Sequence, residues 1–150
     1  MLEAIRLAAE GMERGDGGPF GAVVVKDGKI VGRGWNKVTS SNDPTAHAEV
    51  TAIRDACRNL SSFQLDGCEI YTTCEPCPMC LGAIYWSRPE KIYYACTHKD
   101  AAAAGFDDSF IYKELEKELD KRKIPGFQLL RENGLELFSK WVAMPGKKLY

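Results

Sequence analysis

The sequence lacks several features that would assign it to a special class of protein. Its apolar runs are short, such as 22–25, and lie far below the roughly 20 residues that span a bilayer. It contains no internal repeat, no low-complexity tract and no credible linker. Residues 1–7 predict an amphipathic helix and lack the basic start and continuous apolar region of a signal peptide. We therefore expect one domain over residues 1–150, in the cytoplasm and with no membrane partner.

An excess of charge of either sign is also missing. Twenty Lys and Arg residues almost balance twenty-one Asp and Glu residues, and the net charge is −1. Proteins that bind a long nucleic-acid backbone usually carry a strong positive excess. A polynucleotide partner is therefore not expected, although this balance is compatible with a local basic patch.

The chain has only two histidines but six cysteines, and the cysteines are unevenly placed. Cys74, Cys77 and Cys80 recur at three-residue spacing. In a chain long enough to build its own core, this spacing suits a metal site better than a disulfide framework. The pattern favours a reducing compartment, in agreement with a cytoplasmic protein.

The order of the expected elements indicates an α/β fold. In chain order they are a helix over 2–14, strands over 20–26 and 29–35, a helix opened by Asp43 and Pro44, a strand over 69–73, a helix over 76–86, a strand over 91–96, a helix over 107–122, a strand near 127–130 and a helix around 135–143. Strand–helix–strand order implies right-handed parallel crossovers with helices on both faces of the sheet. We predict a three-layer α/β/α sandwich with a mixed central sheet that begins with a hairpin.

Two of these predictions depend on particular residues. Asp27-Gly28 suits a tight hairpin turn with positive φ. Asp43 is a plausible N-cap, with Pro44 at the first helical position. The inward face of that helix is expected to include Val50, Ile53 and Cys57.

Two short motifs predict a metal centre. His47-Ala-Glu49 is followed later in the chain by Pro76-Cys77-Pro-Met-Cys80, the His-x-Glu and Pro-Cys-x-x-Cys signature of zinc deaminases. Cysteines three residues apart on a helix share one face, and a helix N-terminus favours their thiolate forms. With His47 as a third ligand, one zinc ion per chain would keep its fourth position open for water, as catalytic sites do.

Glu49 is expected to act beside the metal and not to bind it. It lies two residues after His47, which is about 200° around an ideal helix. Zinc lowers the pKa of its bound water towards about 7. Glu49 can then take a proton from this water and deliver it to a ring nitrogen and to the leaving ammonia.

Other readings of the same residues stay open. A lone Cys-x-x-Cys also occurs in thioredoxin-like redox pairs. A closed structural cage of His47, Cys74, Cys77 and Cys80 would satisfy tetrahedral zinc, and so would a non-catalytic zinc-stabilised binding module. Neither the closed cage nor the binding module assigns a chemical role to Glu49. We expect Cys74 to be structural, because it ends a strand outside the helix face that the other two cysteines share.

With these residues in place, the sequence resembles the cytidine-deaminase-like superfamily over nearly its whole length, and its guanine deaminases most closely. The segments that carry the resemblance are 17–25, 42–50, 74–86, 104–112 and 147–150. Segments 42–50 and 74–86 recur, with variation, in bacterial tRNA adenosine deaminases. Segments 106–112 and 147–150 are similar to the guanine deaminases specifically. Residues 133–144 are only loosely similar.

The resemblance implies roles for individual residues. By position they are His47, Cys77 and Cys80 as zinc ligands, Glu49 as proton shuttle, Asn36 as a base contact, Asp108 as an acidic catalytic and substrate-binding residue facing the purine, and Tyr150 as a terminal residue that closes the site. The implied reaction is hydrolysis of guanine, a small-molecule nucleobase, to xanthine and ammonia in purine salvage or catabolism. The implied assembly is a domain-swapped homodimer in which residues from about 126 to 150 are exchanged.

Rival activities keep the same metal site. A tRNA wobble-adenosine deaminase would profit from Lys and Arg around the site, whereas Gly105–Ser109 brings acidic groups that repel phosphate. A cytosine or triazine deaminase would need a tighter pocket for a smaller ring. The purine contacts also have simpler readings, since Asn36 can form a turn and Asp107 or Asp108 can cap a helix.

Overall fold

The structure, a computed structural model, describes all 150 residues. The chain divides into two compact units, Met1–Asp108 and Ser109–Tyr150, and each unit is described by itself. None of its helices combines the length and the apolar character needed to cross a membrane.

The first unit is built on a four-stranded mixed sheet. Its strands are β1 (Gly21–Lys26), β2 (Lys29–Trp35), β3 (Cys68–Cys74) and β4 (Lys91–Cys96), in the spatial order β2-β1-β3-β4. Strand β1 pairs antiparallel with β2 and β3, whereas β3 and β4 are parallel. Asp27 and Gly28 have φ values of 49° and 73°, so the tight hairpin turn is confirmed.

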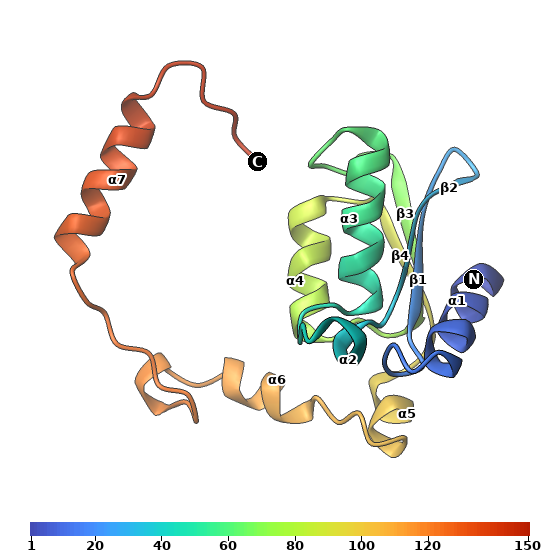
Figure 1. The fold of residues 1–150 in the computed structure, drawn as a ribbon. Helices are drawn as coiled ribbons and strands as arrows, with labels where there is room; N and C mark the ends of the chain where they lie inside the picture. Colours follow the sequence, from blue (N-terminus) through green and yellow to red (C-terminus); the bar gives the residue numbers. More distant parts are fainter. The chain divides into compact units, whose positions relative to one another are not determined.

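Helices cover both faces of this sheet. The first unit contains α1 (Leu2–Glu13), α2 (Val38–Ser41), α3 (Ala48–Leu60), α4 (Pro78–Ser87) and α5 (His98–Ala103). Helices α3 and α4 lie on one face and α1 lies on the other (Figure 1). The predicted α/β/α layers and the parallel crossover through α4 are confirmed, while α2 and α5 were not expected.

The helix predicted to open at Asp43 and Pro44 begins later than expected. Its first residue is Ala48, and His47 is its N-cap. The Asp43 carboxylate accepts hydrogen bonds from the backbone N–H and the hydroxyl of Thr45, at 2.8 and 2.7 Å. Asp43 therefore closes a local turn before the helix, a use of Asp that competes with N-capping.

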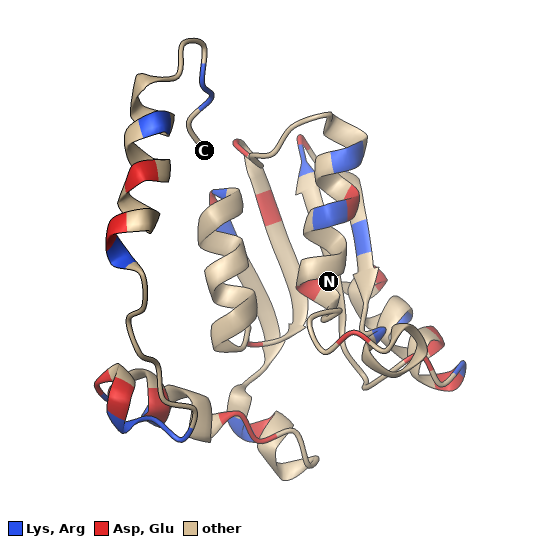
Figure 2. Cartoon of the chain, turned by 60° about the vertical axis from the view of Figure 1, so that its left-hand side comes forward, with Lys and Arg blue, Asp and Glu red and all other residues tan.

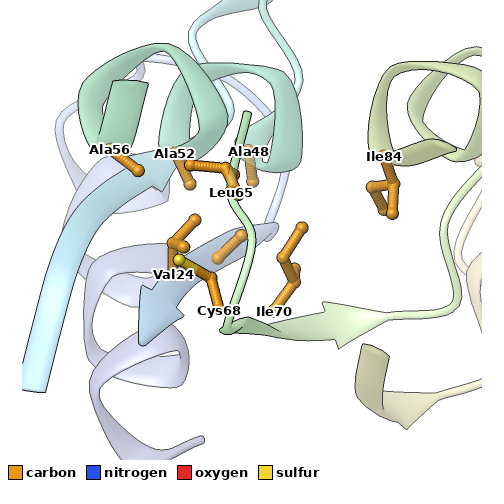
Figure 3. Packing of buried hydrophobic residues seen from close by; sticks show 9 residues of the cluster. Val24, Ala48, Ala52, Ala56, Leu65, Cys68, Ile70 and Ile84 are labelled. Carbon is orange, nitrogen blue, oxygen red and sulfur yellow. The ribbon is translucent and has the colours of Figure 1, made fainter. Parts of the chain in front are cut away.

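The core under α3 consists of small side chains. Val24, Cys68 and Ile70 of the sheet face an alanine stripe on α3, formed by Ala48, Ala52 and Ala56 (Figure 3). Two of the three residues predicted for this inward face, Ile53 and Cys57, pack against the cluster but stay partly exposed. The centre of the face is the alanine stripe, because larger side chains would not fit so close to the sheet.

Two glycines of β2 make this approach possible. A Cβ atom at Gly34 would lie 2.2 Å from the carbonyl oxygen of Ala48, and one at Gly32 would lie 2.5 Å from that of Ala52. Both distances are below van der Waals contact, so any side chain at these positions would push α3 away from the sheet. The N-terminus of α3 is therefore held at a position that glycine alone permits.

The second unit has helices but no strand. It contains α6 (Ser109–Leu115), the short 3₁₀ helix η1 (Leu119–Lys121) and α7 (Arg131–Ala143). The single helix predicted over 107–122 is thus two shorter pieces. The strand predicted near 127–130 was wrong: no strand of the unit offers it a partner, and Leu130 adopts a left-handed φ of 52°. Both signs of charge occur along α3 and along α7 (Figure 2).

Gly34→Ala should destabilise the first unit. The added methyl group meets backbone atoms that cannot rotate away, and overpacking of this kind typically costs about 1–3 kcal/mol. Thermal or denaturant unfolding measures the loss. Gly82→Ala is the matched control, because a Cβ atom there meets nothing within 4 Å and Gly82 lies inside α4. We expect the control to gain about 0.5–1 kcal/mol, and equal effects of the two substitutions would contradict the close contact.

Candidate metal and substrate site

The three predicted metal ligands meet between two helix N-termini. His47 is the N-cap of α3 and Cys77 is the N-cap of α4, while Cys80 lies in the first turn of α4. The two cysteines therefore share a helix terminus and not the helix face that the spacing suggested, because α4 begins at Pro78. Their ligand atoms and that of His47 all lie within 4.8 Å of one another.

The distances fit a tetrahedral zinc ion. The Nδ1 atom of His47 lies 3.6 Å from the Cys77 sulfur and 3.5 Å from the Cys80 sulfur. Bonds of about 2.3 Å to sulfur and about 2.0–2.1 Å to nitrogen, at the tetrahedral angle, require separations of roughly 3.6 Å. Two thiol groups and one imidazole are also the donors that zinc prefers. Three protein ligands leave a fourth position for water.

The two thiols titrate as a pair. A hydrogen bond from Cys80, with a further one from His47, lowers the pKa of the Cys77 thiol to about 4. The same bond to Cys77, followed by burial, raises the pKa of Cys80. One negative charge is thus readily held between the two sulfurs, and a second needs a cation. A divalent metal supplies that cation.

Cys74 does not belong to this group. It ends β3, is buried, and donates from its sulfur to the Thr97 carbonyl at 3.5 Å. Burial raises the pKa of its thiol to about 11, which disfavours the thiolate that metal binding needs. The ligand cluster contains His47, Cys77 and Cys80 without it. The geometry therefore supports the open site over the closed four-ligand cage.

Glu49 lies beside the ligands, in the first turn of α3, and is only 6% exposed. Its Oε1 accepts a hydrogen bond from the Thr72 hydroxyl at 3.0 Å, and its Oε2 accepts one from Cys80 at 3.4 Å. Burial raises the pKa of this carboxyl. The hydrogen bond from Thr72 thus holds the Glu49 side chain next to the group of potential metal ligands.

Thr72 was missed by the sequence reasoning. It is 1% exposed and lies on β3, where the inward residues alternate with partly exposed ones. That two-residue period also places Cys68, Ile70 and Cys74 inward. A hydroxyl in an otherwise apolar inward row was the available signal, because a buried polar group needs a partner.

Asn36 follows β2 and is 6% exposed. Its Oδ1 accepts from the Val38 backbone N–H at 3.1 Å, so the residue does form the turn that its simpler reading expected. A Cβ atom at Gly17 would lie 2.0 Å from this oxygen, so Gly17 leaves room for the amide. With Oδ1 engaged in the turn, the NH₂ group is the part of Asn36 best suited to donate to a ligand.

Asp108 ends the first unit, and its electrostatics link it to the metal site. Burial, followed by the neighbouring Cys77 sulfur, raises the pKa of the Asp108 carboxyl. Asp108 in turn contributes to the raised pKa of His47, whose main cause is the hydrogen bond with Cys77. The loop before Asp108 is held by Phe106, which packs edge-to-face on Phe20 with ring centroids 4.9 Å apart.

Tyr150 is the last residue of the second unit and is 70% exposed. Its predicted closing role concerns a site in the other unit and stays a prediction.

An apolar cavity of about 430 Å³ also lies in the first unit, between α1, α5 and the ends of β3 and β4. None of the three metal ligands lines it, so it is distinct from the metal site.

Comparison with known proteins agrees with this geometry. Residues 1–96 match the model of the cytidine and deoxycytidylate deaminase zinc-binding region. The chain belongs to the cytidine and deoxycytidylate deaminase family. It is therefore a zinc-dependent deaminase, and the His47, Cys77 and Cys80 cluster is where such an enzyme would hold its metal.

Individual relatives show which deaminases the chain is similar to. It is 60% identical to a guanine deaminase of Bacillus subtilis over 150 residues, which are all of this chain and 96% of the relative. An X-ray structure of the Bacillus subtilis guanine deaminase superposes with a TM-score of 0.96 at 59% identity, covering 99% of this chain and 95% of that one. A tRNA-specific adenosine deaminase of Aquifex aeolicus is 46% identical over 96 residues, which are 64% of this chain and 63% of the relative.

Cys80→Ser and Cys74→Ser should differ sharply in metal content. Loss of the Cys80 thiolate removes one of three ligands, so zinc should fall well below one ion per chain and stability should fall with it. Cys74→Ser should keep about one zinc per chain, as an open three-ligand site requires. Elemental analysis of the two purified variants beside the wild type measures both values. Loss of zinc from the Cys74 variant would favour the closed cage.

Proposed function

We propose that this protein hydrolyses guanine to xanthine and ammonia, as a purine salvage or catabolic enzyme of the cytoplasm. The observation that carries the proposal is similarity at 60% identity to a guanine deaminase across all 150 residues. The similarity to the Aquifex aeolicus tRNA-specific adenosine deaminase extends over 96 residues only. Residues outside the zinc-binding region thus also favour guanine.

Zinc held by His47, Cys77 and Cys80 would activate a water molecule for attack on C2 of the base. Glu49 serves as the proton carrier of this reaction. Its Oε2 atom faces the ligand group while Thr72 holds Oε1, so one carboxylate oxygen is anchored and the other faces the chemistry. Glu49 takes a proton from the attacking water and delivers it to the ring nitrogen, and it then carries the proton of the hydroxyl group formed at C2 to the departing ammonia.

Asp108 and Asn36 select the base. An ionised Asp108 accepts from the N1–H and N2–H groups of guanine, and adenine offers no such pair of donors on that edge. The Asn36 NH₂ group donates to an acceptor of the base. A wrong base leaves these polar groups unmatched in a desolvated site, which is how hydrogen-bonding pockets reach high discrimination.

The proposed function is tested by ammonia release from purified zinc-loaded protein. Guanine should be consumed at a far higher kcat/KM than adenine, cytosine, cytidine, ammeline or tRNA. Glu49→Gln is the matched negative control: it should keep zinc and lose roughly 10²- to 10⁴-fold in turnover, the usual contribution of an acid–base group. If tRNA or cytosine is consumed at a higher kcat/KM than guanine, guanine is not the preferred substrate. If Glu49→Gln keeps full turnover, the Glu49 carboxylate is not the proton carrier.

We further propose that the active enzyme is a homodimer in which the C-terminal segment, from about residue 126, is exchanged and Tyr150 covers the partner's site. Each deaminase domain would then consist of most of one chain together with the C-terminal segment of its partner. In support, no residue of 109–150 is fully buried. On α7, Leu137, Phe138 and Val142 are 67–70% exposed. Apolar surface of this extent marks a face that another protein surface covers.

Complementation between two proteins of impaired activity tests the exchange. Deletion of residues 148–150 should reduce activity with little change in zinc content, because no metal ligand is removed. Mixing this truncated protein with full-length Glu49→Gln protein should restore part of the activity. Exchanged dimers then contain one site with an intact Glu49 and a complete tail from the partner. The absence of recovery after confirmed subunit exchange would mean that the tail acts on its own chain or has no role.

A further inference from the structure

The loop between α1 and β1, residues 14–20, is bonded to the chain on both sides of Asn36. The Asp16 carboxylate accepts a hydrogen bond from the indole N–H of Trp35 at 2.8 Å. The backbone carbonyl of Asp16 accepts from the Ser40 N–H at 3.1 Å and from the Thr39 hydroxyl at 2.8 Å. One residue of the loop therefore bonds to the residue before Asn36 and to the short helix α2 after it.

The Trp35 ring is itself held in place. A Cβ atom at Gly11 would lie 2.4 Å from Cδ1 of Trp35, so the ring packs directly on the backbone of α1. The Nζ atom of Lys37 lies 3.9 Å from the ring centroid and Cζ of Arg14 lies 5.0 Å from it, both within cation–π range. The Trp35 hydrogen bond is the main cause that lowers the pKa of the Asp16 carboxyl, so an ionised Asp16 holds the indole by a charge-assisted bond.

Gly17, the next residue of the loop, touches the Asn36 side chain. A Cβ atom at Gly17 would lie 2.0 Å from Oδ1 and 2.9 Å from Cγ of Asn36. The φ of Gly17 is not positive, so the space beside the amide, and not the backbone conformation, requires glycine here. Oδ1 also accepts from the Val38 N–H, and the Asn36 N–H donates to the Phe20 carbonyl at 2.9 Å. The Asn36 amide is thus confined by its own turn and by the loop.

We propose that Asp16 and Gly17 are positioning residues that fix the Asn36 amide for recognition of the base. The inference rests on the proposed function, because Asn36 is there a donor to the base. Asp16 and Gly17 do not touch the reacting atoms. Asp16 holds the main chain before and after Asn36, and Gly17 lies against Oδ1. A rotated amide would present its oxygen where the NH₂ group is needed, and two acceptors would then face each other.

Substitutions at Asp16 separate this role from a simple packing role. Asp16→Ala removes the acceptor of the Trp35 N–H, whereas Asp16→Asn keeps an oxygen that can accept from it. The backbone carbonyl that binds Thr39 and Ser40 is present in both variants. Glu13→Ala, at an exposed position at the end of α1, is the matched control. Zinc content, unfolding temperature and the kcat and KM for guanine are measured for each protein.

We expect Asp16→Ala to keep zinc and to raise the KM for guanine by roughly tenfold, the scale of one lost hydrogen bond to a charged group. The value of kcat should change much less, because a contact made equally in the ground state and the transition state affects KM alone. Asp16→Asn should recover most of the wild-type KM, and Glu13→Ala should match the wild type.

The decisive comparison repeats these substitutions in an Asn36→Ala background. If Asp16 works through Asn36, Asp16→Ala should raise KM no further there. Gly17→Ala should also raise KM in the wild type. Its effect should shrink in the Asn36→Ala background, because the Oδ1 and Cγ atoms that the new methyl group would meet are gone. If Asp16→Ala does not fold, Trp35→Phe removes the same hydrogen bond from the donor side and takes its place.

Three outcomes would overturn the positioning role. The first is a wild-type KM in Asp16→Ala. The second is an increase in KM that multiplies with that of Asn36→Ala, which would show that Asp16 acts independently of Asn36. The third is an Asp16→Asn variant as impaired as Asp16→Ala, which would remove the hydrogen bond as the cause. Failure of the wild type to consume guanine would instead refute the proposed function, and the same comparison is then made with the base that the enzyme does consume.

Discussion

The close contact between α3 and β2 is the constraint on which the site depends. Gly32 and Gly34 have no Cβ atoms, so the alanine stripe of α3 can approach the sheet until backbone nearly meets backbone. This approach brings His47 and Glu49, at the start of α3, within reach of groups on β3 and α4. A larger residue anywhere in this contact would move His47 and Glu49 together. Packing and chemistry are therefore coupled in one interface.

The buried polar side chains of the site all have hydrogen-bond partners. Glu49 accepts from Thr72 and Cys80, the Cys77 and Cys80 sulfurs lie 3.6 and 3.5 Å from Nδ1 of His47, and no buried side-chain nitrogen or oxygen lacks a hydrogen bond. Such networks make every member costly to remove, because the remaining partner is left unsatisfied in a low dielectric. They also hold side chains in one arrangement, which acid–base chemistry at a metal requires.

The two units of the chain differ in what their sequences can stabilise alone. The first unit buries apolar residues on both faces of its sheet, in two separate clusters. The second unit, 109–150, buries none of its residues completely, although it is rich in Leu and contains Phe110, Phe127, Phe138 and Trp141. A segment of this composition needs a surface outside itself to bury those side chains. That need is the physical basis for proposing an exchanged dimer.

The sequence by itself determined the layers, the hairpin at Asp27-Gly28 and the group of His47, Cys77 and Cys80 that could hold a metal, because periodicity, turn chemistry and motif spacing are properties of residues close together in the chain. It did not determine where α3 and α4 begin. Asp43 turned out to close a turn, and His47 and Cys77 became N-caps, since a helix start is chosen by competing local bonds and by packing. Only the tertiary structure brought Thr72 to Glu49 and His98 to Glu75. Those contacts join residues far apart in the chain, and no local pattern encodes which distant group will satisfy a buried carboxylate.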